Sequence, residues 1–307
     1  MHRRNAISSR RKLKFSQEPP KKKRCVESGP DMHYGLQCSE PDMPHDQLEQ
    51  KCKIYLQKLQ ERFTSHEDQQ QIEKETRGQH ENIKWREIRQ NCLTASNFGT
   101  VIKRRPSTHC HNLVKRLLYG KELNTASIIY GRTHECEAIK KYETVKGVKV
   151  TRCGIFVDID YPYLAASPDG LVAENGLLEV KCLPSLGNQI IKNVTLKRVC
   201  FTVVDGEVRL NPQHPYYFQV QRQLNITKRD YCDFVIFTEN DFAVNRIYRD
   251  VNLWNDEMLP KLISFYTNCM LPEIIDGRVP RGLKIRDPQN DTSEESLAIP
   301  LVQSDSE

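Results

Sequence analysis

Two acidic residues and one lysine stand at a spacing that suits metal-dependent chemistry on phosphate groups. Asp169 belongs to the turn sequence Ser167-Pro168-Asp169-Gly170, and Glu179-Val180-Lys181 follows a short way along the chain. Alternation along a strand would put Glu179 and Lys181 on one face and turn Val180 toward the core. A hairpin of this length can bring the carboxylates of Asp169 and Glu179 together. Two carboxylates suit Mg²⁺, and a nearby lysine can hold or deprotonate an attacking water.

Each half of this pattern is also common without any catalytic role. Ser-Pro-Asp-Gly is an ordinary turn sequence, and Glu-x-Lys is a frequent pair on an exposed strand. The hairpin around them is apolar, however, with leucine at positions 171, 177 and 178. The combination is therefore more specific than either half alone.

The elements that must position these residues form a mixed α/β pattern. Helical periodicity or capping predicts helices at 84–91, 95–104 (with Ser96 as its cap), 109–119, 127–146, 214–226 and 252–270. Alternation and turn residues predict strands at 148–151, 155–157, 163–166, 170–172, 177–182, 232–238 and 244–249, and a hairpin at 201–210. We expect an α/β (α+β) fold, with a mixed, mostly antiparallel sheet flanked by helices.

A helical extension is expected before this domain, over residues 45–84. Apolar residues recur at three- and four-residue steps from Asp46, and the pattern predicts one amphipathic helix to about Gln79 that loses its apolar stripe after Phe63. Its role, whether to cap the main domain or to join a partner helix, stays open.

Charge is concentrated at the two ends of the chain. Residues 1–24 carry ten Lys or Arg and one acid, whereas residues 287–307 carry six acids and no Lys or Arg. We expect disordered tails at 1–44 and 276–307. The cluster Lys21, Lys22, Lys23 and Arg24 is typical of a nuclear import signal that an import receptor binds. The alternatives are a solubilising charge run and a mitochondrial presequence.

The eleven cysteines are scattered and form no C-x-x-C motif, which favours free thiols in a reducing compartment. The triplet His109-Cys110-His111 has no second cluster at metal-ligand spacing, so we interpret it as structural. No apolar run reaches the length of a membrane span, and the start does not resemble a secretory signal. We expect a soluble protein that is not secreted.

Four segments, in order, resemble the motifs of the YqaJ-type viral recombinase family, which includes phage lambda exonuclease. They are Trp85–Ser96 (with Arg89 and Thr94-Ala95-Ser96), Gly131–Ala138, Leu164–Cys182 and Tyr216–Gln221. The resemblance covers about residues 85–270 and implies a restriction-endonuclease-like PD-(D/E)XK nuclease domain at 85–275. It covers neither terminus nor the helical extension.

The resemblance also implies roles for particular residues. Asp169, Glu179 and the backbone carbonyl of Val180 would bind Mg²⁺, with Mn²⁺ as a substitute. Glu135 would reach the same site from its helix, directly at a second metal or through water. Lys181 would position the nucleophilic water.

On the substrate side, the resemblance implies that Arg89 and Ser96 hold the terminal phosphate of DNA, which suits a guanidinium and a hydroxyl at a helix start. Gln219 and Tyr216 would orient the site or the scissile phosphate. Without the family, Glu135 would belong to a solvated acidic face and Arg89 would be a surface residue.

The sequence thus predicts a metal-dependent DNA nuclease, most simply a 5′-to-3′ exonuclease on duplex DNA that uses a metal-bound water. Family members resemble ring-forming trimers, so a homo-oligomer is one possibility. The alternative is a catalytically silent nuclease fold kept as a nuclear DNA-binding or scaffold protein. Clustered carboxylates argue against it, because they repel phosphate unless a metal is present. A nuclease of the RecB type ranks lower, since iron–sulfur clusters need grouped cysteines.

Overall fold

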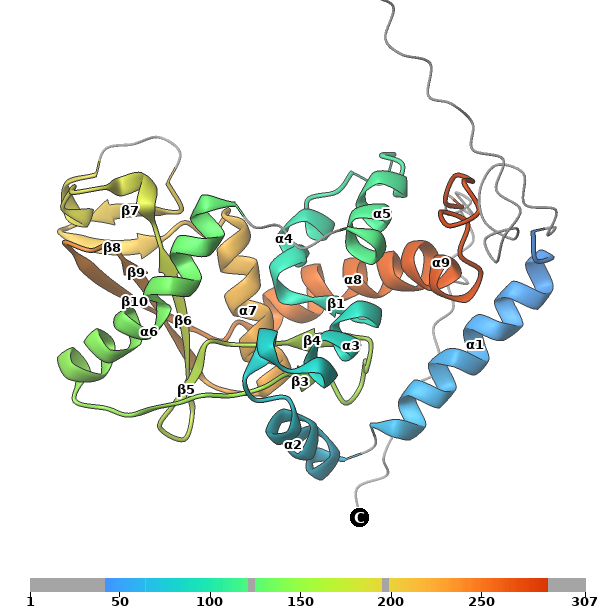
Figure 1. Ribbon diagram of the computed structural model, residues 1–307, viewed down its shortest axis with the longest axis horizontal. Helices are drawn as coiled ribbons and strands as arrows, with labels where there is room; N and C mark the ends of the chain where they lie inside the picture. Colours follow the sequence, from blue (N-terminus) through green and yellow to red (C-terminus); the bar gives the residue numbers. More distant parts are fainter. Residues whose placement is uncertain (1–41, 64, 106, 121–124, 195–198, 287–307) are drawn as a thin grey trace, which may run out of the picture.

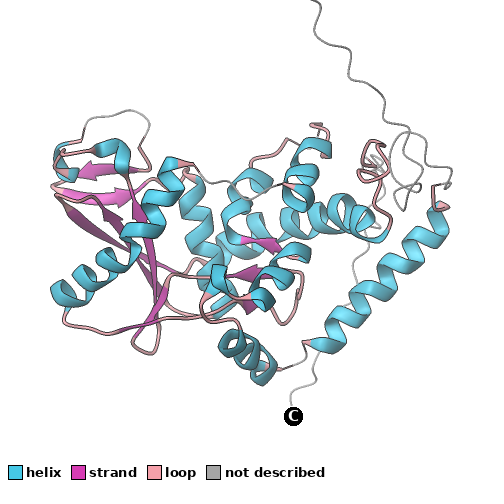
Figure 2. Cartoon of the chain, in the orientation of Figure 1, coloured by secondary structure: helices cyan, strands magenta, loops and turns pink. Residues whose placement is uncertain are grey.

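The structure, a computed structural model, describes residues 42–63, 65–105, 107–120, 125–194 and 199–286. The main sheet lies at one end of the molecule, a few short strands lie near the middle, and the other end is helical (Figure 1, Figure 2). The expected mixed α/β fold is confirmed. The import candidate Lys21–Arg24 and the acidic end from 287 lie outside the described residues.

The main sheet has five strands in the order β10-β9-β6-β5-β2. They are β2 (Val150–Thr151), β5 (Gly170–Val172), β6 (Gly176–Cys182), β9 (Tyr231–Phe237) and β10 (Phe242–Tyr248). The pairs β2–β5, β5–β6 and β9–β10 are antiparallel, and only β6–β9 is parallel. The sheet is therefore mostly antiparallel, as predicted, with β6 in its interior.

Helices cover both faces of this sheet. Helix α6 (Ala126–Lys146) packs on one face, where Ala138, Ile139 and Tyr142 meet the buried side of β6 and β9. Its bounds lie within one residue of the predicted 127–146. The Thr125 side chain accepts a hydrogen bond from the backbone of Ile128 at its start, and Gly147, which ends it, has φ +65°. Helix α7 (Pro215–Thr227) covers the opposite face.

Helix α7 shares that face with a two-stranded hairpin, β7 (Phe201–Val204) and β8 (Glu207–Leu210). Asp205 and Gly206 turn it with φ of +52° and +73°, which is the two-residue turn that the sequence predicts. The apolar side chains of the hairpin pack into the cluster beneath α7. The β7–β8 hairpin is thus attached to the main sheet.

A second, small sheet lies next to the hairpin formed by β5 and β6. Its order is β1-β4-β3, with β1 (Leu93–Thr94) parallel to β4 (Leu164–Ala166), and β3 (Phe156–Val157) antiparallel to β4. Strand β4 is fully buried and runs directly into the turn that carries Asp169.

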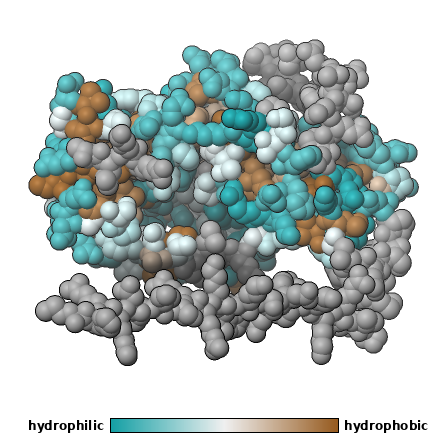
Figure 3. Space-filling model, turned by 90° about the horizontal axis from the view of Figure 1, so that it is seen from above, coloured by the Kyte–Doolittle hydropathy of each residue, from teal (hydrophilic) through white to brown (hydrophobic). Residues whose placement is uncertain are grey.

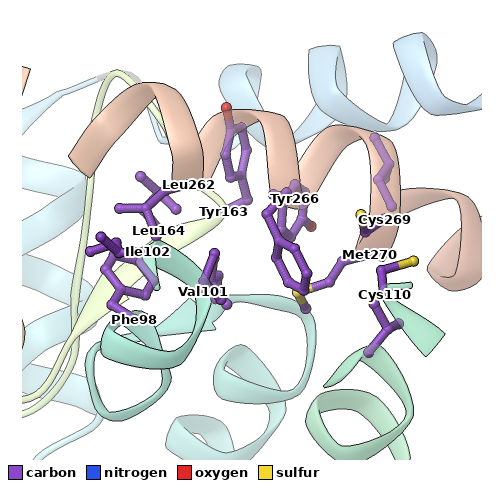
Figure 4. Close-up of a cluster of buried hydrophobic side chains, with 14 of the residues drawn as sticks. Phe98, Val101, Ile102, Cys110, Tyr163, Leu164, Leu262, Tyr266, Cys269 and Met270 are labelled. Carbon is purple, nitrogen blue, oxygen red and sulfur yellow. The ribbon is translucent and has the colours of Figure 1, made fainter. Parts of the chain in front are cut away.

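The helical end has its own apolar core. Helix α4 (Ala95–Ile102) and α5 (His111–Tyr119) pack against a continuous helical run of π-helical and α-helical turns, which contains α8 (Leu259–Phe265) and α9 (Leu271–Ile275). Figure 4 shows side chains of α4, among them Phe98, facing those of the run. Tyr163 and Tyr266 stack at 4.3 Å between ring centroids in the same cluster.

The helical extension differs from its prediction in one respect. The expected single helix at 46–79 is two helices, α1 (His45–Arg62) and α2 (His66–Glu75), followed by a 3₁₀ turn at Gln79–Glu81 and by α3 (Ile83–Asn91). Ser65 and Asp68 form a reciprocal capping box that starts the second helix. This local signal overrides the continuous helical period.

The expected tail boundary at 276 is also corrected. Residues 276–286 pack on the domain, where Asp276 forms ion pairs with Arg281 and Arg286, and Ile285 is buried. The Asp276 carboxylate also accepts a hydrogen bond from the backbone of Met43, which ties this segment to the start of α1.

The surface mixes hydrophilic and hydrophobic residues, as the face in Figure 3 shows. Exposed large apolar side chains are spread over several elements, including Ile83, Ile129 and Tyr248. Within the part of the chain that the structure describes, no helix is both long and apolar enough to cross a membrane.

Candidate active site

The predicted hairpin places Asp169 beside Glu179 and Val180. The last ladder pair of β5 and β6 on this side joins Gly170 to Leu178, and Asp169 is the next residue outward. Its backbone N–H donates to the Leu178 carbonyl at 3.1 Å. In return, the Val180 N–H donates to Oδ2 of Asp169 at 2.7 Å. The carboxylate of Asp169 is therefore held over the strand that carries Glu179.

Glu179 is a buried carboxylate, with 1% of its side chain exposed. Its Oε1 accepts from Gln219 at 2.6 Å and its Oε2 accepts from Gln223 at 2.7 Å, both from α7. Lys181 forms an ion pair with the same carboxylate. Burial of a charge is tolerated only with partners of this kind. Glu179 and Lys181 thus share one face, as strand alternation predicts.

The ammonium of Lys181 also lies 4.9 Å from the centre of the Tyr216 ring. The structure therefore brings Tyr216 and Gln219 to the same cluster as the hairpin residues. Both come from the first two turns of α7, where His214 caps the helix by accepting from the Tyr216 N–H at 3.2 Å.

The carboxylates and the lysine shift one another's ionisation. The pKa of Asp169 is raised well above its ordinary value, first by burial and then by the carboxylates of Glu179 and Glu135. Burial works to lower the pKa of Lys181, but Glu179 and Asp169 outweigh it and raise that pKa. Lys181 is therefore a cation at neutral pH, which suits holding a water or a phosphate oxygen more than deprotonating one.

Glu135 reaches the edge of this cluster from α6, but its carboxylate is paired with Arg152. Among the described residues, no group of three or more His, Cys, Asp or Glu side chains could hold a metal ion. The donors on offer are the two carboxylates of Asp169 and Glu179 and the backbone carbonyl of Val180. These are hard oxygen ligands of the kind that Mg²⁺ takes together with water. The pKa of Asp169 is raised first by burial and then by the neighbouring carboxylates, and a cation would relieve the second effect.

Arg89 lies on α3 and Ser96 on α4. The guanidinium of Arg89 stacks on the ring of Trp85 at 4.2 Å, and the Trp85 indole N–H donates to the Ser167 hydroxyl at 2.9 Å. Because Ser167 is two residues before Asp169, this contact fastens α3 to the site.

Ser96 does not cap its helix, which corrects the prediction. Helix α4 begins at Ala95, so the cap position belongs to Thr94 and Ser96 lies in the first turn with an exposed side chain. The neighbouring backbone is supported by Arg222, a fully buried arginine that donates to the carbonyls of Leu93 and Ala165.

Sequence reasoning missed several residues that support the site. Gln223 binds Glu179 as directly as Gln219 does, and its position four residues later on the same helix face is a signal that could have found it. Gln221, by contrast, faces away and donates to the Tyr248 carbonyl at 2.9 Å. Arg152 has no local sequence signal, because its partner is distant in the chain.

Gln79 of the extension was also missed. Its side-chain amide donates to the carbonyls of Cys153 at 3.1 Å and Pro168 at 2.8 Å, and its backbone has φ +46°. Nearby, the Glu73 carboxylate and the Thr76 hydroxyl accept from the backbone of Gly154 and the residue after it. The extension therefore holds the strand-to-turn segment that precedes Asp169.

The triplet at 109–111 has structural contacts, in agreement with its interpretation. The His111 ring accepts from the Ile285 N–H at 3.1 Å, and the Cys110 thiol is buried against the Arg286 carbonyl at 3.5 Å. These contacts hold α5 to the C-terminal segment.

Comparison with known proteins gives one family and several similar structures. Residues 84–230 match the YqaJ-like viral recombinase domain. The alkaline exonuclease LHK-Exo from Laribacter hongkongensis is 27% identical, with 61% of this chain and 91% of that chain covered and a TM-score of 0.49. A phage-related exonuclease from Haemophilus somnus 129PT is 14% identical, with coverages of 60% and 95% and a TM-score of 0.41.

The shutoff and exonuclease protein of Kaposi's sarcoma-associated herpesvirus is 11% identical, with coverages of 81% and 77% and a TM-score of 0.44. No curated protein matches the chain. The family match begins one residue before Trp85 and includes the β5–β6 hairpin and the whole of α7. The predicted resemblance is confirmed, because residues 84–230 match the family model of the YqaJ-like viral recombinase domain.

Proposed function

We propose that this chain is a metal-dependent deoxyribonuclease that hydrolyses phosphodiester bonds. The observation that carries the proposal is the cluster formed by Asp169, Glu179 and Lys181, in which the Val180 N–H binds the Asp169 carboxylate at 2.7 Å. It offers oxygen ligands to a divalent cation and an ammonium beside them. The presence of a domain from a family that includes phage lambda exonuclease supports the same function.

The proposed cofactor is Mg²⁺, with Mn²⁺ as a substitute, and its ligands would be Asp169, Glu179 and the Val180 carbonyl. When bound, the ion would supply Lewis acidity toward a phosphate oxygen and a water molecule. The two glutamines of α7 hold the Glu179 carboxylate in one orientation. The Lys181 ammonium can donate to the water or to the phosphate oxygen that gains charge in the transition state.

For the substrate, we propose duplex DNA degraded from a 5′ end. Arg89 and Ser96 would bind the terminal phosphate, since the first is linked through Trp85 and Ser167 to the turn that carries Asp169. The family resemblance also motivates the proposal of a homo-oligomer. Nuclear import by a receptor that binds Lys21–Arg24, with a mitochondrial location as the alternative, rests on the sequence alone.

The test is digestion of end-labelled linear DNA by the full chain with Mg²⁺, Mn²⁺ or a chelator. We expect cleavage only with metal, and loss of cleavage in Asp169→Asn and Lys181→Ala while far-UV circular dichroism stays unchanged. Asp205→Asn, on the distant hairpin tip, is the matched control and should keep full activity. Cleavage that persists in both folded active-site variants would contradict the proposal and favour a silent nuclease fold with a contaminating activity.

A second comparison separates the modes of cleavage. Linear DNA with and without a 5′ phosphate, and covalently closed circles, are digested under the same conditions. We expect fast digestion of phosphorylated ends and no cutting of circles. Circles cut as fast as linear ends would overturn the exonuclease proposal and leave the nuclease proposal standing.

A further inference from the structure

Arg152 joins the two elements that carry the outer acids of the site. It follows β2 directly, and its Nη1 donates to the Glu135 carboxylate of α6. The same nitrogen lies 3.4 Å from the carbonyl oxygen of Asp169. Its Nη2 lies 3.2 Å from the Cys136 sulfur. One guanidinium thus contacts helix α6 and the catalytic turn together.

The charges around Arg152 set a limit on how many metal ions the site can accept. Three carboxylates, those of Asp169, Glu179 and Glu135, face two cationic side chains, Lys181 and Arg152. The Arg152 guanidinium already supplies a positive charge at Glu135. A metal ion bound there would lie beside that like charge at short range. Glu135 would also have to give up its arginine to become a ligand.

We propose that Arg152 is the cation that serves Glu135, so that this carboxylate is not available to a second metal ion. It pairs with Glu135 and restricts the site to one divalent ion, bound at Asp169 and Glu179. This inference rests on the proposed nuclease function, since it concerns the metal content of that same site. Arg152 is a positioning residue in this scheme: it holds Glu135 away from the ion and braces the Asp169 turn against α6.

The pair is half-exposed, with 47% of the Arg152 side chain and 32% of the Glu135 side chain accessible. An isolated pair at this exposure contributes little to stability. Its effect is therefore expected in the metal stoichiometry, and the fold should survive its removal. This separates a role in the site from a merely structural one.

The test is calorimetric titration of the full chain with Mn²⁺ in the absence of DNA. We expect one bound ion in the wild type, a shift to two in Arg152→Gln, and one again in Arg152→Lys, which keeps the positive charge. The double variant Arg152→Gln with Glu135→Gln should again bind one ion, because it lacks the carboxylate that Arg152→Gln alone sets free. Arg209→Gln removes an exposed arginine paired with Glu207 and is the control that should leave one ion.

A second measurement does not depend on Arg152 variants. Glu135→Gln alone should still bind one Mn²⁺ ion, and it should reduce the affinity for Mn²⁺ much less than Asp169→Asn does. Two ions in the wild type, or one ion with unchanged affinity in folded Arg152→Gln, would overturn the inference and leave the nuclease proposal intact. No Mn²⁺ binding by the wild type would instead overturn the metal-dependent function, and this inference with it.

Discussion

Asp158 makes the stability of this fold depend on pH in a direction that can be measured. The residue is 4% exposed, and its Oδ1 accepts from the backbone N–H groups of Asp160 at 3.0 Å and Tyr161 at 2.9 Å. Burial raises the pKa of Asp158 to about 6, although these two hydrogen bonds and the nearby Lys228 work to lower it. The folded protein therefore holds this proton more tightly than the unfolded chain does.

The sign of the effect follows from that difference. The contribution of Asp158 to stability is complete below pH about 4 and is lost as pH rises through about 6. Raising the pKa of Asp158 from about 4 to about 6 on folding corresponds to about 3 kcal/mol in the free energy of unfolding. Asparagine can accept both hydrogen bonds through Oδ1 without a charge. Asp158→Asn should therefore match the wild type near pH 4 and exceed its free energy of unfolding by up to about 3 kcal/mol at pH 7.5.

The assay is urea unfolding of both proteins at pH 4.5, 6.0 and 7.5, compared as the difference between variant and wild type. Taking the difference cancels the titration of groups that the two proteins share. Asp205→Asn, at the exposed turn of the β7–β8 hairpin, is the control and should show no such rise with pH. A difference that stays constant with pH, or a variant less stable than wild type at pH 7.5, would refute the reasoning.

Three further predictions concern the supports of the site. Gln79→Ala removes both hydrogen bonds to the backbone before Asp169. We expect the free energy of unfolding in urea to fall by about 1–2 kcal/mol. The nuclease rate should fall by a larger factor than in Gln57→Ala, an exposed control. Gly154→Ala would place Cβ 2.1 Å from a backbone oxygen of α2, and a loss of about 1–3 kcal/mol is expected; unchanged stability would show that the extension is not tightly docked. Trp85→Phe keeps an aromatic ring but loses the indole N–H that donates to the Ser167 hydroxyl. KM for 5′-phosphorylated ends should rise while the melting temperature falls by only a few degrees. Equal effects on phosphorylated and unphosphorylated ends would count against a role beside the phosphate.

Local patterns were sufficient for most elements of the fold. The boundaries of α6 follow from Thr125 and Gly147, and the turn of β7–β8 follows from Asp205-Gly206. The break after Phe63 could also have been predicted, because Ser65 and Asp68 form a recognisable capping box. Elements that carry their own start and stop signals were therefore accessible from sequence.

Contacts between distant segments were not accessible in this way. The parallel pairing of β6 with β9 brings Glu179 beside Phe234, and no periodicity encodes which strands pair. The same holds for Arg152, whose partners lie on another helix and another turn. Asp169, Glu179 and Lys181 were found because one short hairpin contains them all. Side chains that approach the cluster from elsewhere were missed unless a family motif named them.

The pairing of β6 with β9 has a practical consequence for dissecting the molecule. The family match stops at residue 230, and β9 begins at Tyr231. A fragment trimmed to the matched segment would leave β6 with an open, apolar edge, and it would also lack Gln79. Such edges promote aggregation by joining strands of other molecules. A fragment made for study should therefore run from Asp42 to Arg286 and should not end at residue 230.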